Sequence, residues 1–205
     1  MAPIVIVDYG MGNIGSLQNM IKKAGGESLV SSKLEDIETA EKIILPGVGA
    51  FDNGMKNLEE RGLVKALTAS VKTGTPFLGV CLGMQLLTKS SEEGKLPGLG
   101  WIDARTLRFK FPAGTKLKIP NMGWNEVNVK KDAPLFRGLG ADAAFYFVHS
   151  YHVVCNDSED VLATAEYGYE FVSAVQHANI YGVQFHPEKS HKYGLTVIKN
   201  FIEGV

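Results

Sequence analysis

The chain has 205 residues, of which 45% are hydrophobic and 21% charged, and its formal net charge is -1. This composition excludes an intrinsically disordered chain, and the near-zero charge without a basic patch argues against nucleic acid as a partner. The opening MAPIVIVDYG has no basic segment and its apolar run is broken by Asp8, so we expect neither a signal peptide nor a membrane span. Two cysteines are too few for a disulfide framework of this size, and we expect both as thiols in the cytoplasm.

The N-terminal half alternates short apolar runs with segments of helical spacing. Strands are expected at 3–9, 27–32, 42–46 and 75–80. Helices are expected at 13–25, at 52–73 and from about residue 81 onward. Continuous apolar strands that alternate with helices are typical of a parallel sheet covered on both faces.

From residue 99 onward, strand-like segments follow one another with turn residues between most of them. They lie at 99–109, 123–129, 143–153, 161–167, 171–177 and 180–185, and a closing helix is expected at 191–205. We therefore expect an α/β fold with a central, mostly parallel sheet flanked by helices, and with additional antiparallel or mixed strands in the C-terminal half. Since no repeat, linker or low-complexity segment interrupts the chain, we expect one domain, 1–205.

The segment GVCLG, residues 79–83, stands between a buried strand and a helix. A Gly-x-Cys-x-Gly turn at that place is typical of a nucleophile elbow, which projects one side chain above the edge of the sheet. The start of a helix also lowers a thiol's pKa and offers N–H groups to an anion. A lone cysteine is usually a small buried apolar residue, but this pattern favours Cys81 as a nucleophile. Cys155 has no such setting.

The segment GVQFHPEKS, residues 182–190, offers a base for that nucleophile. Pro187 disfavours a helical conformation at His186, and in an extended chain residues two apart lie on the same face. Glu188 can then bind one imidazole nitrogen while the other faces the thiol. An oxyanion hole is also required: the N–H of Leu82 is the first candidate donor, and the turn LPGVGAF could supply the second from Val48 or Gly49.

Together, PGVGAF, GVCLGMQLL and GVQFHPEKS resemble the class I (triad) glutamine amidotransferases, over essentially the whole chain. DYGMGN, PGVGAF, SEEG, MGWN and FVHSY resemble, more narrowly, the glutaminase subunits of imidazole glycerol phosphate synthases. The resemblance implies that Cys81 attacks the side-chain amide of glutamine, that His186 protonates the departing ammonia, and that Glu188 orients His186. It implies an oxyanion hole from Val48 and Leu82, no cofactor, and a substrate site that contains Gly49, Gln85, Glu93, Ser150 and Tyr151. Glu92 is close enough to leave the choice of carboxylate open.

The resemblance also implies a partner, because a glutaminase that serves a synthase should deliver ammonia through protein. A separate (β/α)8 cyclase subunit would form a heterodimer with this chain and receive ammonia to make imidazole glycerol phosphate and AICAR in histidine biosynthesis. Met122, Trp124 and Asn13 would lie at the interface, although Trp124 could equally be a core residue. Asn121 and His152 replace residues common in the subfamily, which puts interface contact and coupling in doubt.

Two further motifs suggest other ligands. Gly10, Gly12 and Gly15 match the dinucleotide pattern Gly-x-Gly-x-x-Gly after a strand, but the next strand ends LVSS, without the confirming acid. His149, His152 and Cys155 have a spacing that suggests a metal site, yet alternation along one strand would send His152 to the opposite face, and we expect no metal. Alternative functions are the glutaminase of another synthase, such as that of vitamin B6 synthesis, and an inactive binding module of the same fold.

Overall fold

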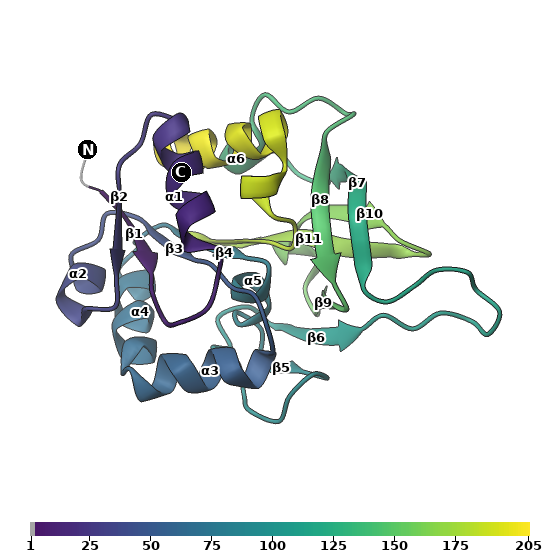
Figure 1. Ribbon diagram of the computed structural model, residues 1–205, viewed down its shortest axis with the longest axis horizontal. Helices are drawn as coiled ribbons and strands as arrows, with labels where there is room; N and C mark the ends of the chain where they lie inside the picture. The colour runs from purple at the N-terminus through teal and green to yellow at the C-terminus, as the bar shows by residue number, and fades with distance from the viewer. Residues whose placement is uncertain (1–2) are drawn as a thin grey trace.

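The computed structural model describes residues 3–205, and its N-terminal half is built on a parallel sheet (Figure 1). The strands lie in the order β2, β1, β3, β4, β12, and all neighbours in this set are parallel. Their bounds are β1 (Ile4–Val7), β2 (Ser28–Ser31), β3 (Ile43–Leu45), β4 (Phe77–Val80) and β12 (Ile180–Val183). One neighbour of β4, the strand β12, therefore comes from near the C-terminal end of the chain.

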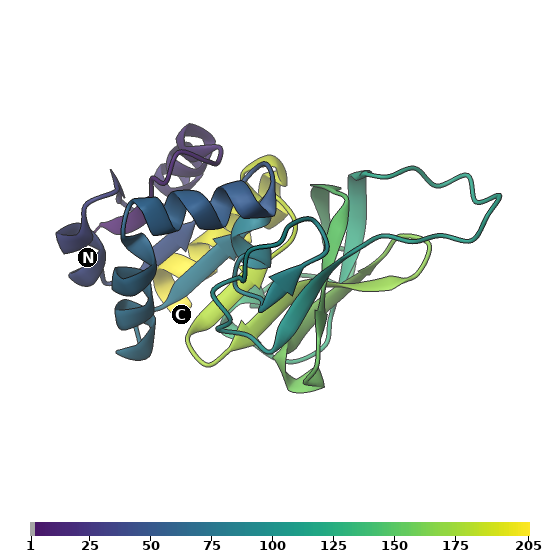
Figure 2. The same ribbon diagram turned by 90° about the horizontal axis from the view of Figure 1, so that it is seen from below.

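Helices cover both faces of this sheet. One face carries α1 (Ile14–Lys23) and α6 (His191–Gly204), and the other carries α2 (Leu34–Glu38), α3 (Phe51–Glu60) and α4 (Leu63–Lys72) (Figures 1 and 2). The residues of β1 alternate between two cores: Ile4 and Ile6 pack with α1 and α6, whereas Val5 and Val7 pack with the other helices. This two-sided burial explains why the strands are apolar throughout.

The expected helix at 52–73 is two helices, because Gly62 adopts a left-handed conformation with φ of 69° and ends the first before the second begins. The short helix α2 was not expected from the sequence. The described chain also contains the 3-10 segments η1 (Pro134–Phe136), η2 (Ser158–Asp160) and η3 (Pro187–Lys189).

The C-terminal half adds antiparallel strands to the same sheet, which confirms the expected fold class. Beyond β12 the order is β11 (Glu170–His177), β10 (Val161–Glu166), β7 (Asn121–Val129) and β8 (Ala144–His149). A side branch contains β9 (Tyr151–Cys155), β6 (Ala104–Arg108) and β5 (Ser90–Ser91). The loop between β6 and β7 projects well beyond the sheet (Figures 1 and 2).

The single strand expected at 143–153 is wrong, because the chain changes direction at Ser150. Before this residue β8 pairs with β7, and after it β9 pairs with β6 and β11. His149 and His152 therefore lie on two different strands, so the expectation that they point to opposite faces of one strand does not apply. Both imidazole rings instead pack against the ring of Phe109, with centroids 5.2 and 4.8 Å from it.

The turn after β4 leads into α5 (Leu82–Gln85) and is held by close backbone contacts at two glycines. A Cβ atom on Gly79 would lie 2.6 Å from the carbonyl oxygen of Gly83, and one on Gly83 would collide with the carbonyl oxygen of Leu45. Any side chain at these positions would push α5 away from β3 and β4. The glycines of GVCLG thus let the cysteine turn pack directly on the sheet.

Gly83→Ala is expected to lower the free energy of unfolding by about 2–3 kcal/mol, since the added methyl group meets main-chain atoms that cannot move aside. The matched control is Gly15→Ala in α1, where the added Cβ has no atom within 4 Å beyond its chain neighbours and the nearby backbone of its own helix. There, the higher helix propensity of alanine should leave stability unchanged or raise it by up to about 1 kcal/mol. Urea denaturation of both variants tests this, and equal midpoints would contradict it.

Candidate active site

Cys81 stands at the carboxyl end of β4, on the turn into α5. Its side chain is 7% exposed, and its φ of 56° is unusual for a residue with a side chain. The N–H of Cys81 donates to the carbonyl of Val183 at 2.8 Å, which ties the turn to the end of β12. The sharp turn expected at GVCLG is therefore present in the structure.

His186 follows β12 and lies beside its expected carboxylate. Nδ1 of His186 is 2.9 Å from Oε1 of Glu188, and the two side chains are 2% and 3% exposed. Pro187 opens the 3-10 turn η3 between them, and the N–H of His186 donates to the carbonyl of Tyr146 at 2.9 Å. The backbone of this segment is therefore fixed against β8, and Glu188 reaches back to the ring as the sequence predicts.

The electrostatics of the site favour an imidazolium at His186. Burial alone would lower the pKa of this ring, but the adjacent Cys81 and Glu188 side chains raise it to about 10. The nitrogen that does not face Glu188, Nε2, has no hydrogen-bond partner among the described residues. A buried N–H without a partner is costly, so Nε2 is the nitrogen from which a group in the pocket can accept a proton.

Cys81 and His186 line one pocket of about 320 Å³. All five residues expected to bind substrate contribute to its wall, as do both expected oxyanion residues. The complete lining is Val48, Gly49, Cys81, Leu82, Gln85, Glu93, Pro120, Val148, His149, Ser150, Tyr151 and His186. Residues from both halves of the chain therefore meet at the carboxyl ends of β4 and β12.

The structure separates the two adjacent glutamates. Glu93 lines the pocket, and its Oε2 accepts a hydrogen bond of 2.8 Å from the N–H of Phe51. Glu92 is not in the pocket lining and instead accepts hydrogen bonds from Lys110 Nζ and from the N–H of Arg108, both at 2.8 Å. Only Glu93 is placed to meet a ligand beside Cys81.

The glycine-rich turn after β3 contacts the elbow through its carbonyl groups. The N–H of Leu82, an expected oxyanion donor, donates to the carbonyl of Gly47 at 3.4 Å. The neighbouring carbonyl of Pro46 accepts a 2.7 Å hydrogen bond from the hydroxyl of Tyr9, which is fully buried. In this conformation, the Leu82 donor is therefore occupied by the protein itself.

Two polar residues near the nucleophile were not singled out from the sequence. The Tyr9 hydroxyl holds the glycine-rich turn, and burial, followed by the charge of Cys81, raises its pKa. Gln184 is fully buried, and its Nε2 lies 3.8 Å from Sγ of Cys81. A glutamine inside the otherwise apolar run GVQF was the available signal, because a buried amide needs hydrogen-bond partners.

Asn121 and His152 do not lie at a surface. Asn121 is 1% exposed and its amide nitrogen is 3.2 Å from Nε2 of His149, while Nε2 of His152 is 3.0 Å from the hydroxyl of Tyr169. The expectation that these two positions bear on contact with a partner is therefore not supported by their location. His152 packs on the buried ring of Phe109, and Asn121 contacts His149, which packs on the same ring.

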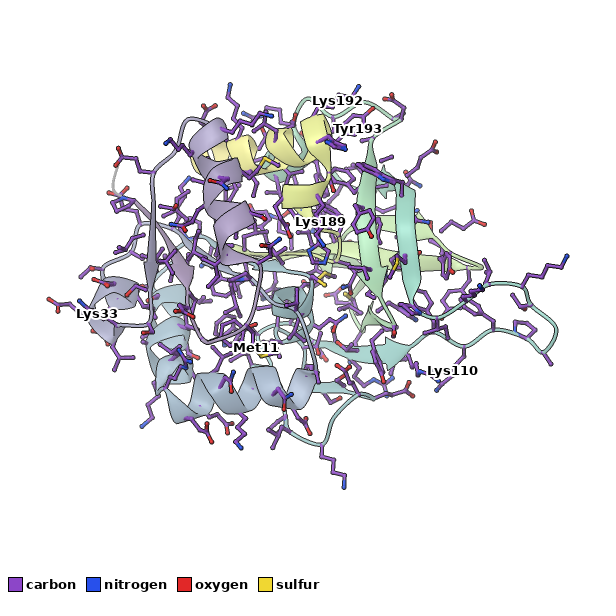
Figure 3. All side chains as sticks on the ribbon, in the orientation of Figure 1. Met11, Lys33, Lys110, Lys189, Lys192 and Tyr193 are labelled. Carbon is purple, nitrogen blue, oxygen red and sulfur yellow. The ribbon has the colours of Figure 1, made fainter. Side chains whose placement is uncertain are left out.

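Two large apolar side chains are exposed on β7, where Met122 pairs with Val148 of the pocket wall. Met122 and Trp124 on β7 are 62% and 47% exposed, so Trp124 is not a core residue, and its indole stacks on the imidazole of His191 at 5.3 Å. Lys189, labelled in Figure 3 near the start of α6, lies over the ring of Tyr146 at 5.6 Å from its centroid. Val48 is also 45% exposed, and Asn13 is exposed at the start of α1.

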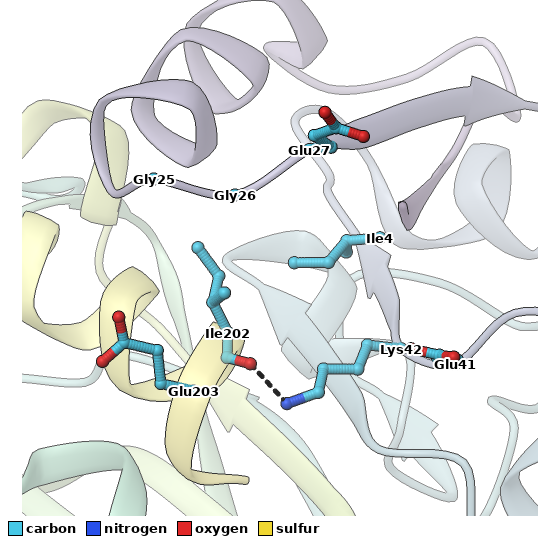
Figure 4. A pocket seen from close by; sticks show the side chains of 8 residues that line it. All are labelled: Ile4, Gly25, Gly26, Glu27, Glu41, Lys42, Ile202 and Glu203. Atoms are coloured by element: carbon cyan, nitrogen blue, oxygen red, sulfur yellow. Dashed lines mark hydrogen bonds between the residues drawn. The ribbon is translucent and has the colours of Figure 1, made fainter. Parts of the chain in front are cut away.

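A second hollow, of about 780 Å³, lies at the amino ends of the parallel strands, opposite the first pocket (Figure 4). Its lining contains Lys42, whose ammonium group is bound by main-chain carbonyls of Phe201, Ile202 and Val205. Among the described residues, neither a cysteine nor a histidine lines this hollow. It lacks the nucleophile and base that make the first pocket a candidate active site.

The motifs that suggested other ligands have structural explanations. A Cβ atom on Gly12 would lie 2.9 Å from the side chain of Pro46, and its φ is 115°, so packing of the turn requires glycine there. Within residues 3–205 no group of three or more potential metal ligands comes together. In the same part of the chain, no helix has the length and apolarity needed to cross a membrane.

The sequence matches one family over nearly its full length. The family described as Glutamine amidotransferase class-I matches residues 5–205. Imidazole glycerol phosphate synthase subunit HisH 2 of Methanococcus maripaludis is 54% identical over 201 residues, 98% of each chain. The protein of the same name from Pseudomonas aeruginosa is 50% identical over 201 residues, again 98% of each chain.

Solved structures with low sequence identity have the same fold. PurLQS from Thermotoga maritima superposes with a TM-score of 0.74 at 20% identity, over 98% of this chain and 98% of that one. A glutamine amidotransferase from the same organism gives a TM-score of 0.64 at 18% identity, over 92% of this chain and 77% of that one. These likenesses extend to the fold alone.

The imidazole of His186 is expected to titrate near pH 10, well above its ordinary value of 6.5. Because the folded pKa is raised, the stability that this proton contributes is present below about pH 6.5 and is lost as the pH rises through about 10. Glu188→Gln should lower the midpoint, since it removes a carboxylate that favours the imidazolium. NMR of protein with ¹⁵N-labelled histidine measures the His186 midpoint in the wild type and in the variant.

His149 is the internal reference in the same spectra. Burial lowers its pKa to about 4, so its ring should stay neutral across the range in which His186 titrates. A wild-type midpoint near 6.5 for His186, or one that Glu188→Gln does not move, would be inconsistent with the buried pair.

Proposed function

The chain belongs to the class I glutamine amidotransferase family, and we propose that it hydrolyses glutamine to glutamate and ammonia through a thioester on Cys81. The observation that carries the proposal is the meeting of Cys81 with the buried His186–Glu188 pair in one pocket. The required parts are a nucleophile, a base and a group that orients the base. All three occur here, on two well-packed segments that follow neighbouring strands.

In the first half of the reaction, the Cys81 thiolate attacks the side-chain amide carbon of glutamine. The C–N bond then breaks, and the His186 imidazolium supplies the proton with which the nitrogen leaves as ammonia. In the second half, neutral His186 takes a proton from water, which attacks the thioester and releases glutamate and the thiolate. Glu188 holds Nδ1 throughout, so that Nε2 is the nitrogen that exchanges protons.

The oxyanion that forms in each half needs N–H donors. We assign Leu82 and Val48 to this role, although the carbonyl of Gly47 now accepts the Leu82 hydrogen bond. Gly47 C=O and Val48 N–H belong to one trans peptide group and point in opposite directions. Rotation of that peptide would free the Leu82 N–H and turn the Val48 N–H inward in a single movement.

The pocket wall suits the polar ends of glutamine. The Glu93 carboxylate is the natural partner for the substrate's α-ammonium group, because an opposite charge at a partly buried site is strongly favoured. We assign the remaining substrate contacts to Gln85, Gly49 and the backbone around Ser150 and Tyr151, which line the same pocket.

We further propose that the ammonia passes to a (β/α)8 cyclase subunit that makes imidazole glycerol phosphate and AICAR in histidine biosynthesis, in the cytoplasm. The relatives are named as subunits of imidazole glycerol phosphate synthase, and ammonia released into neutral water would mostly become unreactive ammonium. The exposed Met122 and Trp124 on β7 suit an interface, and we assign Asn13 to its edge. We propose that residues 1–205 act as one domain.

Glutamate release by the purified protein is expected to be low and to rise at least tenfold when a cyclase subunit is added together with its ribulosyl ligand, because the Leu82 donor must first be freed. Cys81→Ala should abolish turnover under both conditions and leave the fold intact. Enzymatic detection of glutamate, with circular dichroism for the variant, measures these outcomes.

Each alternative result has a definite meaning. Turnover retained by Cys81→Ala would overturn the thioester mechanism. Full activity of the wild type without a partner would indicate an uncoupled amidase, and glutamate release with no imidazole product would indicate a different ammonia acceptor.

Glu93→Gln is expected to raise the KM for glutamine about tenfold or more, because a charge-assisted hydrogen bond contributes roughly 1.5–3 kcal/mol. Glu92→Gln is the matched control, since the adjacent carboxylate binds Lys110 and lies outside the pocket lining. Its KM should stay within about twofold of the wild type. Steady-state kinetics with the partner present test both, and the reverse pattern would assign the substrate contact to Glu92.

A further inference from the structure

Gln184 contacts the reacting sulfur from a position that neither the triad nor the substrate site explains. It follows β12 directly, two residues before His186, and none of its surface is exposed. Its Nε2 lies 3.8 Å from Sγ of Cys81, within hydrogen-bonding range for a sulfur acceptor. A side-chain amide buried this deeply must have its polar groups paired, so its contact with the nucleophile points to a role.

The hydrogen-bond network fixes which end of the Gln184 amide faces the sulfur. The carbonyl oxygen of Tyr151 can only accept, so the atom of Gln85 that lies 3.1 Å from it must be the amide nitrogen. The same nitrogen lies 3.0 Å from Gln184, which must present its oxygen there. The Gln184 NH₂ group is therefore left to point at Cys81.

We propose that Gln184 donates a hydrogen bond to the Cys81 thiolate, stabilises that ionised form and holds the sulfur in its attacking position. This inference rests on the proposed function of the site. It deepens that function because Gln85 and Tyr151, which orient the Gln184 amide, also line the glutamine pocket. The donor to the nucleophile is thus fixed by groups that face the substrate.

A neutral amide is a suitable donor at this place. The helix that begins after Cys81 spans only Leu82–Gln85, so its dipole can contribute little to a thiolate. His186 must give its proton to the leaving nitrogen, after which its positive charge no longer stabilises the sulfur. Gln184 keeps its protons at every step, so its contribution to the thiolate persists when the thioester is hydrolysed.

The test measures the pH dependence of Cys81 alkylation by iodoacetamide, in which the thiolate displaces iodide. A Cys155→Ser background leaves one thiol; burial, together with Asp160 and Asp157, raises the pKa of Cys155 to about 12. Gln184→Met removes the N–H donor and keeps the side-chain length. It should move the alkylation midpoint upward by about one pH unit, the size expected for a lost hydrogen bond to a charged group.

Gln176→Met is the matched control. Gln176 lies on β11, and its Nε2 donates to the hydroxyl of Tyr181 at 3.2 Å, away from the pocket. Its alkylation profile should coincide with that of the background protein. Turnover with the partner should show a lower kcat and an unchanged KM for Gln184→Met, and neither change for the control.

A second measurement needs no change at position 184, in case Gln184→Met does not fold. With ¹⁵N-labelled glutamine, the side-chain NH₂ signals of Gln184 should shift as the thiol titrates, and Cys81→Ser should remove that shift. The proposal would be overturned if Gln184→Met and the Cys155→Ser background gave the same alkylation profile. It would also be overturned if the Gln184 NH₂ signals did not change as the Cys81 thiol is titrated. Alkylation requires neither glutamine nor a partner, so a failure of the glutaminase assay would leave this result independent.

Discussion

The backbone turn at Cys81 is the constraint on which the site depends. A residue with a side chain is held at φ of 56°, in a region that costs free energy unless the surroundings enforce it. The enforcement comes from main-chain packing: Gly79 lies against Gly83, Gly83 lies against Leu45, and the Cys81 N–H is tied to Val183. Because these contacts use backbone atoms, glycine is required at both flanking positions. The strained turn directs the sulfur of Cys81 into the pocket.

The second condition is the position of β12 between the parallel and antiparallel parts of the sheet. Its register with β4 sets Val183 opposite Val80, so the residues that follow the two strands leave the sheet side by side. One of these continuations is Cys81, and the other carries Gln184 and His186. On its other side β12 is antiparallel to β11, which pairs with β9, the strand that begins at Tyr151 directly after Ser150. A single strand therefore aligns the nucleophile, its base and the substrate wall.

The parts of this site that could be predicted from sequence are those set by local chemistry. The glycines around Cys81 and the proline between His186 and Glu188 restrict the backbone within a few residues, so elbow and base were recognisable. The pairing of β12 with β4 joins segments about one hundred residues apart and has no local signal. The change of direction at Ser150 was missed because both flanking segments are strand-like. The Gly47 carbonyl on Leu82 depends on one peptide orientation, which residue types do not determine.

Two histidines in one pocket show that burial leaves a ring neutral unless an opposite charge lies beside it. Both rings are almost fully buried, and burial disfavours the imidazolium in each. His186 lies beside Cys81 and the carboxylate of Glu188, which together more than offset that penalty. His149 instead binds the carbonyl of Tyr151 through Nδ1 and the amide of Asn121 through Nε2, and both partners are satisfied by a neutral ring with its proton on Nδ1. A neutral His149 adds no positive charge that would compete with His186 for the proton. The pocket can thus hold a single imidazolium, that of His186, next to the sulfur. The neutral ring of His149 instead holds the backbone of Tyr151, which faces the substrate.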